Sequence, residues 1–305
     1  MVEDQLPDEC GPMVGEVAAN VWVISDLQTV DPKGVSDYLT TAIDDITAAT
    51  DGLGQIWYLG DATYGTDLER VERIATRQFD ILADLDPSLR YVMGNHDLDY
   101  VEETGEFKSP FYELVQSHPD WRTTDSRTDF YFFDEIGDWT VLFLSDHVAS
   151  DGRWIASHGG VHQESERYPY TQEDYRMVVD QLEATDGPAI IAGHYAFSGG
   201  NRPAEIQDWF FPLPENVRLH LYGHAHIGDE EWVGKDAFRT FSYIDDHRIP
   251  QVDVASLEDY RGDTVRSALL TLYTSGVVNV SIRDHRRNIW LESYFQHPTA
   301  VVPTE

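Results

Sequence analysis

Five short stretches of the sequence end in residue types that bind metal ions or transfer protons. Each follows an apolar run, and four of them contain a glycine where the run ends. Carboxylates, amide oxygens and neutral imidazoles are ligands for divalent metals, and the set contains no thiolate. Seven such side chains exceed the needs of one ion, so the pattern predicts a pair of metals about 3.5–4 Å apart. The stretches are Asp26-Leu27-Gln28, Gly60-Asp61, Gly94-Asn95-His96-Asp97, Gly193-His194 and Gly223-His224-Ala225-His226.

The apolar runs that precede these stretches have the length and composition of buried strands. Between the first three runs, apolar residues recur at three- and four-residue spacing, which predicts amphipathic helices over 35–49 and 68–82. This alternation of strand and helix is typical of a layered α/β fold, in which ligands bind at the carboxyl ends of the strands. The predicted strands cover residues 19–25, 55–59, 90–93, 188–192 and 217–222.

Beyond residue 127 the pattern changes to hairpins and a third helix. Residues 129–134 and 139–145 are separated by a short stretch that contains Gly-Asp, and they predict one hairpin. A second hairpin is predicted where residues 268–273 and 277–282 flank Thr-Ser-Gly. Apolar spacing predicts a helix over 172–184. We expect the two hairpins and the later strands to complete two sheets with helices outside them.

One domain is expected over residues 20–305, after an acidic lead-in at residues 1–19. Residues 148–170 are rich in Gly, Ser and His and predict a long loop beside the active site. His158 and His162 in this loop fit a substrate lid better than a further metal site, because no carboxylate or cysteine pattern frames them. The sequence shows no internal repeat and no clear linker.

The charge balance is extreme, with 55 acidic residues against 21 basic ones and a formal net charge of -34. The acids are spread along the chain, which indicates a surface adapted to a salt-loaded cytoplasm, as in halophilic archaea. No basic stripe is present for duplex DNA, which argues against nucleic acid as a partner. A single cysteine, Cys10, excludes an internal disulfide. With no signal peptide and no apolar run of ~20 residues, we expect a soluble cytoplasmic protein away from membranes.

The ordered series D-x-Q, GD, GNHD, GH and GHxH resembles the calcineurin-like metallophosphoesterase superfamily between Asp26 and His226. The resemblance implies a four-layer αββα sandwich of two mixed β-sheets flanked by helices. It also implies that His96 faces the phosphate, to stabilise charge or protonate the leaving group, and that Asp97 orients His96. The implied metal ligands are Asp26, Gln28 and His226 for the first ion, Asp61 as a bridge, and Asn95, His194 and His224 for the second ion.

Gln28 is the main departure from the family pattern, which usually has histidine at this position. An amide oxygen is a harder and usually weaker ligand than imidazole, so we expect lower affinity at the first metal position. We expect two divalent metal ions. Mn²⁺ is the favoured metal, with Mg²⁺, Fe²⁺ or Zn²⁺ as alternatives. The D-x-Q form resembles manganese-dependent ADP-ribose and CDP-alcohol diphosphatases, which hints at a nucleotide diphosphate substrate.

The predicted function is hydrolysis of a phosphodiester or pyrophosphate bond in a small nucleotide-like phosphoester substrate. A phosphomonoesterase with the same site is the next alternative, and a non-catalytic binding module of the same fold is the alternative from another class. Asp61, Asn95 and His96 are all present, which argues against a decayed site. Tyr195 and Phe197 follow the fourth stretch, and core packing is favoured over pocket lining for both. The sequence leaves oligomeric state and substrate identity open.

Overall fold

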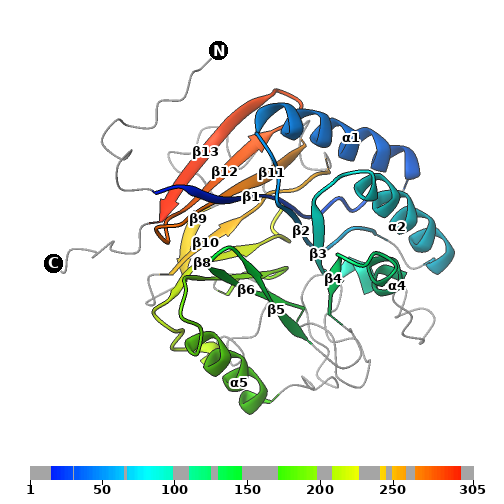
Figure 1. The fold of residues 1–305 in the computed structure, drawn as a ribbon. Coiled ribbons are helices and arrows are strands. Elements are labelled where there is room, and N and C mark those ends of the chain that lie inside the picture. The colour runs from blue at the N-terminus through cyan, green and yellow to red at the C-terminus, as the bar shows by residue number, and fades with distance from the viewer. Residues whose placement is uncertain are drawn as a thin grey trace.

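The computed structural model places two mixed β-sheets face to face with helices on both outer faces (Figure 1). This is the four-layer αββα arrangement predicted from the sequence. All nine predicted site residues fall within the part of the chain that the structure describes. That part comprises residues 15–29, 31–64, 67–98, 110–124, 130–145, 171–197, 208–226, 241–244, 249–258 and 265–296.

The first sheet has seven strands in the order β13-β12-β11-β1-β2-β3-β4. Its parallel half pairs β1 with β2 and β2 with β3, and Trp22 lies beside Ile56 in this register. The other half is antiparallel, because β11 runs against β1 and begins two successive hairpins. The strands are β1 (Val17–Ile24), β2 (Gln55–Leu59), β3 (Ser88–Val92), β4 (Arg122–Thr123), β11 (Arg266–Tyr273), β12 (Val278–Asp284) and β13 (Ile289–Gln296).

The second sheet has six strands in the order β5-β6-β7-β8-β10-β9. Its four central strands are parallel, and its two edge strands are antiparallel to their neighbours. β6 and β7 are buried on both faces of the sheet, which explains their nearly continuous apolar sequences. The strands are β5 (Tyr131–Ile136), β6 (Trp139–Leu144), β7 (Ala189–Gly193), β8 (Val217–Tyr222), β9 (Phe241–Ile244) and β10 (Ile249–Asp253).

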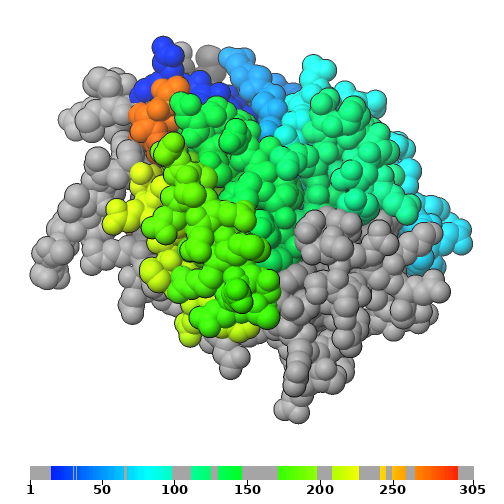
Figure 2. All heavy atoms as spheres, turned by 60° about the horizontal axis from the view of Figure 1, so that its bottom comes forward, coloured from blue at the N-terminus to red at the C-terminus, as the bar shows by residue number. Residues whose placement is uncertain are grey.

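Helices cover the outer face of each sheet (Figure 1). Figure 2 shows the molecule from the side on which α5 lies, outside the second sheet. Short polar side chains begin the longer helices: Asp31 caps α1, Asp67 caps α2, and Thr171 forms a capping box with Asp174 at α5. The helices are α1 (Pro32–Ala49), α2 (Leu68–Ala83), α4 (Pro110–Gln116) and α5 (Gln172–Glu183), with a 3₁₀ turn, η1, at His96–Leu98.

Alternating side chains of each buried strand contribute to different cores. In β1, Trp22 and Ile24 face the core under α1 and α2, whereas Val21 and Val23 face the core between the two sheets. A third core lies between the second sheet and α5. Because both faces of β1 pack against apolar layers, the strand has almost no freedom of position and delivers its carboxyl end to a fixed place.

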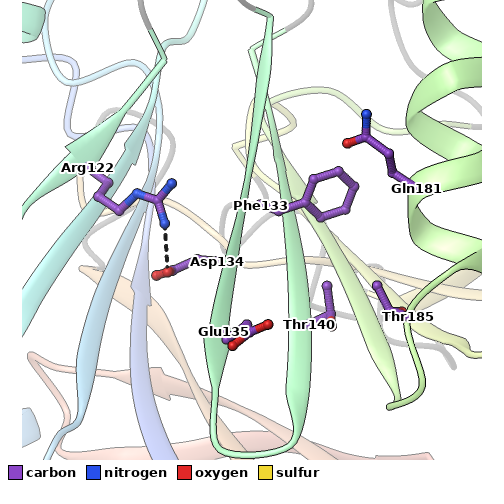
Figure 3. Close-up of a pocket in the computed structure, with 7 residues that line it drawn as sticks. All are labelled: Arg122, Phe133, Asp134, Glu135, Thr140, Gln181 and Thr185. Carbon is purple, nitrogen blue, oxygen red and sulfur yellow. Dashed lines mark hydrogen bonds and ion pairs between the residues drawn. The ribbon is translucent and has the colours of Figure 1, made fainter.

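An ion pair at the sheet edges joins the two sheets on the side away from the predicted site. Arg122 Nη1 lies 2.9 Å from Asp134 Oδ1, and the Arg90 guanidinium bonds the other Asp134 oxygen. Figure 3 shows Asp134 directed toward Arg122 and Phe133 directed toward α5, as expected for neighbouring residues of a strand. The pocket drawn there lies beside Thr140 at the start of β6, so it is remote from the carboxyl ends of the parallel strands.

Several elements differ from the predictions. β1 begins at Val17, two residues before its predicted start and within the predicted lead-in, and β5 continues through Ile136 where a turn was expected. The sequence pattern gave no sign of α4, β9, β10 or β13, which are short or mixed in polarity. The predicted loop at residues 148–170, with His158 and His162, lies outside the described residues. Among the described helices, none has the length and apolar character needed to cross a bilayer.

Candidate metal centre

The structure brings all nine predicted residues to one place, where the carboxyl ends of strands from both sheets meet. Asp26 follows β1, Asp61 follows β2, and Asn95 follows β3 in the first sheet; His194 and His224 follow β7 and β8 in the second. Direct contacts between these side chains join the two sheets across the site. The predicted clustering at strand ends is therefore what the fold produces.

Five of these residues have left-handed backbone conformations. The φ angles are 54° at Asp26, 37° at Gln28, 53° at Asp61, 70° at His224 and 47° at His226. For a residue with a Cβ atom, this conformation costs about 1–2 kcal/mol. Such strain is typical of functional sites, where the surrounding structure holds a side chain in one required direction.

Glycines at the strand ends allow the backbone segments to approach each other closely. A Cβ atom at Gly94 would overlap the backbone nitrogen and a carboxylate oxygen of Asp61. A Cβ atom at Gly223 would overlap the Ser25 hydroxyl and would lie 2.6 Å from Asp26 Oδ2. Gly94 and Gly223 therefore allow the candidate ligands of different strands to reach one centre.

One group of possible metal ligands, at the second predicted metal position, contains Asp61, His194 and His224. His194 Nε2 lies 3.2 Å from Asp61 Oδ2, 3.2 Å from Asn95 Oδ1 and 3.2 Å from His224 Nδ1. The other ring nitrogen of His194 donates to the carbonyl oxygen of Leu59 at 2.7 Å. In a neutral ring, Nε2 therefore carries a lone pair directed at the two side-chain oxygens.

The other group, at the first predicted metal position, contains Asp26, Asp61 and His226. His226 Nε2 lies 2.9 Å from Asp26 Oδ1, and the backbone N–H of His224 donates to the other Asp26 oxygen at 2.8 Å. Gln28 Nε2 donates to Asp61 Oδ2 at 2.6 Å, so the amide lies within reach of the same centre. Asp61 belongs to both groups.

The donor set fits divalent cations. Around His194, two oxygens and a nitrogen lone pair repel one another unless a proton or metal ion lies among them. Each ring nitrogen of His226 faces a carboxylate, but a neutral imidazole has only one N–H group. The other nitrogen therefore needs a proton or a metal ion between its lone pair and the facing carboxylate. Buried oxygen and imidazole groups of this kind suit Mn²⁺, Mg²⁺, Fe²⁺ or Zn²⁺. The residues present therefore fit the metal ions that the sequence implied.

The electrostatics of the cluster indicate the same need for positive charge. Burial lowers the pKa of His194, but Asp61 outweighs burial and raises this pKa to about 9. Burial likewise opposes charge on His226, whereas Asp26 raises its pKa to about 10. Burial and the neighbouring His194 lower the pKa of His224 to about 4, so this ring is neutral and able to bind an ion. A metal ion would replace the protons that the carboxylates attract.

Asp97 has a structural role that the sequence did not predict. Its Oδ2 accepts hydrogen bonds from Asp61 N at 2.9 Å, Gly94 N at 2.8 Å and the Tyr91 hydroxyl at 2.6 Å. Its Oδ1 accepts from the backbone nitrogens of Ala62 and Thr63 at 2.8 and 3.2 Å. The carboxylate thus fixes the loop that carries Asp61. Its orientation of His96 stays a prediction.

His96 follows β3 at the edge of the cluster and is half-buried. Its backbone N–H donates to Asp61 Oδ1 at 2.8 Å. The ring of Tyr64, which is 40% exposed, lies 4.8 Å from the imidazole of His96 between centroids. The described position suits contact with a substrate beside the metal ligands.

Two aromatic residues that follow β7 have separate roles. Phe197 is fully buried in the core under α5, as the sequence favoured. Tyr195 is also buried, but its ring lies 5.1 Å from the His194 ring and 5.0 Å from the His224 ring. Tyr195 therefore packs directly against the two candidate ligand histidines. Its position is explained by this contact as well as by packing in the core.

Sequence reasoning missed two buried acids beside the cluster. Glu258 Oε1 accepts from His226 Nδ1 at 2.8 Å, and Asp253 is fully buried at the end of β10. Burial raises the pKa of Asp253 to about 8, and nearby Asp26 adds to this effect. Asp253 had no clear signal, because β10, which it ends, is short and mixed in polarity. Glu258 had no local signal, since it lies in the irregular segment after β10.

The four-layer αββα sandwich, with carboxylates and imidazoles clustered at its strand ends, defines the class of this protein as an α/β sandwich with a candidate metal site. The comparison with protein families makes this specific. The family described as Calcineurin-like phosphoesterase matches residues 19–228, more than half of the chain. The chain belongs to this family.

Solved structures with the same fold share little sequence with the chain. A purple acid phosphatase from yellow lupin (Lupinus luteus) is 14% identical, with a TM-score of 0.56, and the match covers 92% of this chain and 54% of that protein. A NAD nucleotidase from Haemophilus influenzae is 10% identical, with a TM-score of 0.51, over 90% of this chain and 53% of that protein. The chain thus spans about half the length of these proteins. No curated protein matches the chain.

Proposed function

We propose that this protein is a binuclear-metal phosphoesterase that hydrolyses a phosphodiester or pyrophosphate bond of a small nucleotide-like substrate. The observation that carries the proposal is the position of Asp61, which belongs to both possible ligand groups. A carboxylate shared in this way suits two ions held side by side. Family membership supports phosphoric ester chemistry at this site.

Each group of side chains would hold one ion. Asp26, Gln28 and His226 are proposed for the first, His194, His224 and Asn95 for the second, with Asp61 between them. When bound, two divalent ions supply positive charge for the phosphate oxygens and lower the pKa of the attacking water. The His224 ring is neutral, so it can bind a cation. Burial raises the pKa of Asp61, but the neighbouring His194 outweighs burial and lowers this pKa, so the carboxylate is ionised and can also bind a cation.

His96 is proposed to act on the substrate itself. Its backbone is fixed to Asp61, and the residue is half-buried at the edge of the cluster. An imidazole there can donate a hydrogen bond to a phosphate oxygen and give a proton to the leaving oxygen. The Asp97 carboxylate contributes by fixing the Asp61 loop beside His96.

The substrate class and cellular setting are also proposals. The D-x-Q form with Gln28 favours Mn²⁺ and a nucleotide diphosphate, and the same fold accommodates a nucleotidase in Haemophilus influenzae. The net charge of -34 favours a salt-loaded, halophilic cytoplasm and disfavours nucleic acid as substrate. A phosphomonoesterase is the second candidate, because the ligand groups serve either ester.

Hydrolysis of bis-p-nitrophenyl phosphate and of p-nitrophenyl phosphate tests the proposal. The assay is run in high salt with Mn²⁺, Mg²⁺, Zn²⁺ or a chelator, and with ADP-ribose as a diphosphate substrate. His96→Ala is compared with His118→Ala, in which the imidazole lost is stacked on Trp121 in a segment remote from the metal-ligand strand ends.

Diester or diphosphate cleavage that requires metal, falls at least about 100-fold in His96→Ala and survives in His118→Ala would support the proposal. Preferential cleavage of the monoester would favour the phosphomonoesterase. Folded protein that binds metal and cleaves none of these substrates would favour the binding module.

A further inference from the structure

The segment after β10 passes directly behind two ligands of the first metal position. Leu257 N donates to the Ser25 carbonyl at 3.1 Å, and Glu258 N donates to the Asp26 carbonyl at 3.3 Å. Glu258 Oε1 also accepts from His226 Nδ1 at 2.8 Å. One residue therefore contacts the backbone of Asp26 and the imidazole of His226, which lie 200 residues apart in the sequence.

This contact fixes which nitrogen of His226 can bind a metal. Since Nδ1 donates to the Glu258 carboxylate, Nε2 carries the lone pair and points toward Asp26 Oδ1, 2.9 Å away. His194, in the other group, uses the neutral Leu59 carbonyl for the same purpose. A carboxylate partner makes an imidazole a stronger metal ligand than a neutral carbonyl does. The two metal positions therefore have different support.

We propose that Glu258 is a positioning residue for the metal position of Asp26, Asp61 and His226, and that its negative charge offsets the weak neutral ligand Gln28. The inference rests on the proposed function for the presence of two metal positions. Gln28 offers a neutral amide, a weaker ligand than an imidazole, so the affinity of this metal position depends on an additional source. Glu258, only 6% exposed and in contact with His226, supplies it.

A merely structural acid would behave differently, and the chain offers one for comparison. Glu292 on β13 is 8% exposed, similar to Glu258, but it bonds the Tyr294 hydroxyl and lies on the edge strand of the first sheet. Glu292→Gln therefore controls for the loss of a buried carboxylate away from the site. Glu258→Gln keeps an oxygen that accepts from His226 and removes only the charge, whereas Glu258→Ala removes both.

The test is calorimetric titration of metal-free protein with Mn²⁺ in high salt, with folding checked by circular dichroism. For wild-type protein we expect two binding steps. Glu258→Ala should weaken one step by roughly 10–100-fold and leave the other near wild type. Glu258→Gln should weaken the same step by a smaller factor, and Glu292→Gln should change neither. Adding Gln28→His to Glu258→Ala should restore the weakened step.

Wild-type affinities in both Glu258 variants would overturn the inference, as would equal weakening of both steps. If Glu258→Ala fails to fold, Glu258→Gln decides by the same criterion. Two-step Mn²⁺ binding with one step weakened, in a protein that cleaves no phosphoester, would uphold the role of Glu258 while refuting the proposed function. A wild-type protein that binds a single Mn²⁺ or none would refute both.

Discussion

The substitution Asp97→Asn separates two roles for this residue. In the structure, the Asp97 carboxylate accepts five hydrogen bonds from the Asp61 loop, the Gly94 turn and Tyr91. The resemblance to the family implied instead that Asp97 orients His96. The first role predicts a loss of stability, and the second predicts a loss of turnover with little change in stability.

The magnitude follows from the hydrogen bonds. An amide group has one oxygen, so Asn at this position leaves at least two buried donors without an acceptor: either Ala62 N and Thr63 N, or Asp61 N, Gly94 N and the Tyr91 hydroxyl. Each unsatisfied buried donor costs about 1–3 kcal/mol, so the expected loss is about 2–6 kcal/mol. This is a large share of the total free energy of unfolding, which is about 5–15 kcal/mol for most proteins.

Urea unfolding in molar KCl, followed by tryptophan fluorescence, measures this loss. Tyr91→Phe removes only one of the five donors and should cost about 1 kcal/mol, which places it between wild type and Asp97→Asn. If Asp97→Asn changes the free energy of unfolding by less than about 0.5 kcal/mol while hydrolysis falls, the reasoning is refuted. Asp97 would then act through His96.

Three further results are expected. Gly94→Ala introduces a methyl group that overlaps Asp61, so it should cost about 1–3 kcal/mol in urea unfolding and weaken Mn²⁺ binding in calorimetry; unchanged Mn²⁺ affinity would contradict the close approach of the two strand ends. Burial raises the pKa of Asp45, but hydrogen bonds from Arg283 and His285 outweigh it and lower the pKa to about 2. This carboxylate therefore stabilises the fold above pH ~4, and its contribution is lost as pH falls toward 2. Unfolding experiments across this range should show a weaker pH dependence in Asp45→Asn, and an identical dependence would exclude the ion pair as its source. The net charge of -34 should make the fold depend on molar salt, where the screening length is ~3 Å, and full ellipticity and an unchanged melting temperature in dilute buffer would show that it does not.

The candidate ligand residues were predictable because their signals are local. A buried strand, a glycine and a polar residue lie next to each other in the chain, so Asp61 and His194 could be read directly. The long helices α1 and α2 were predictable for the same reason, since their apolar spacing and caps lie within one segment. The strands β9, β10 and β13 were missed because they are short or mixed in polarity, so no clear apolar run marks them in the sequence.

The sequence by itself determined the types of ligand, their order, the two-sheet α/β architecture and the acidic surface. Only the tertiary structure decided that His226 lies 2.9 Å from Asp26, that Glu258 supports this pair, and that Asp97 fixes the Asp61 loop. The physical reason is that periodicity and turn residues act over a few positions, whereas these contacts join segments separated by 32 to 200 residues. Such contacts arise when two packed sheets bring their carboxyl ends together, and local sequence patterns contain no information about which side chains then meet.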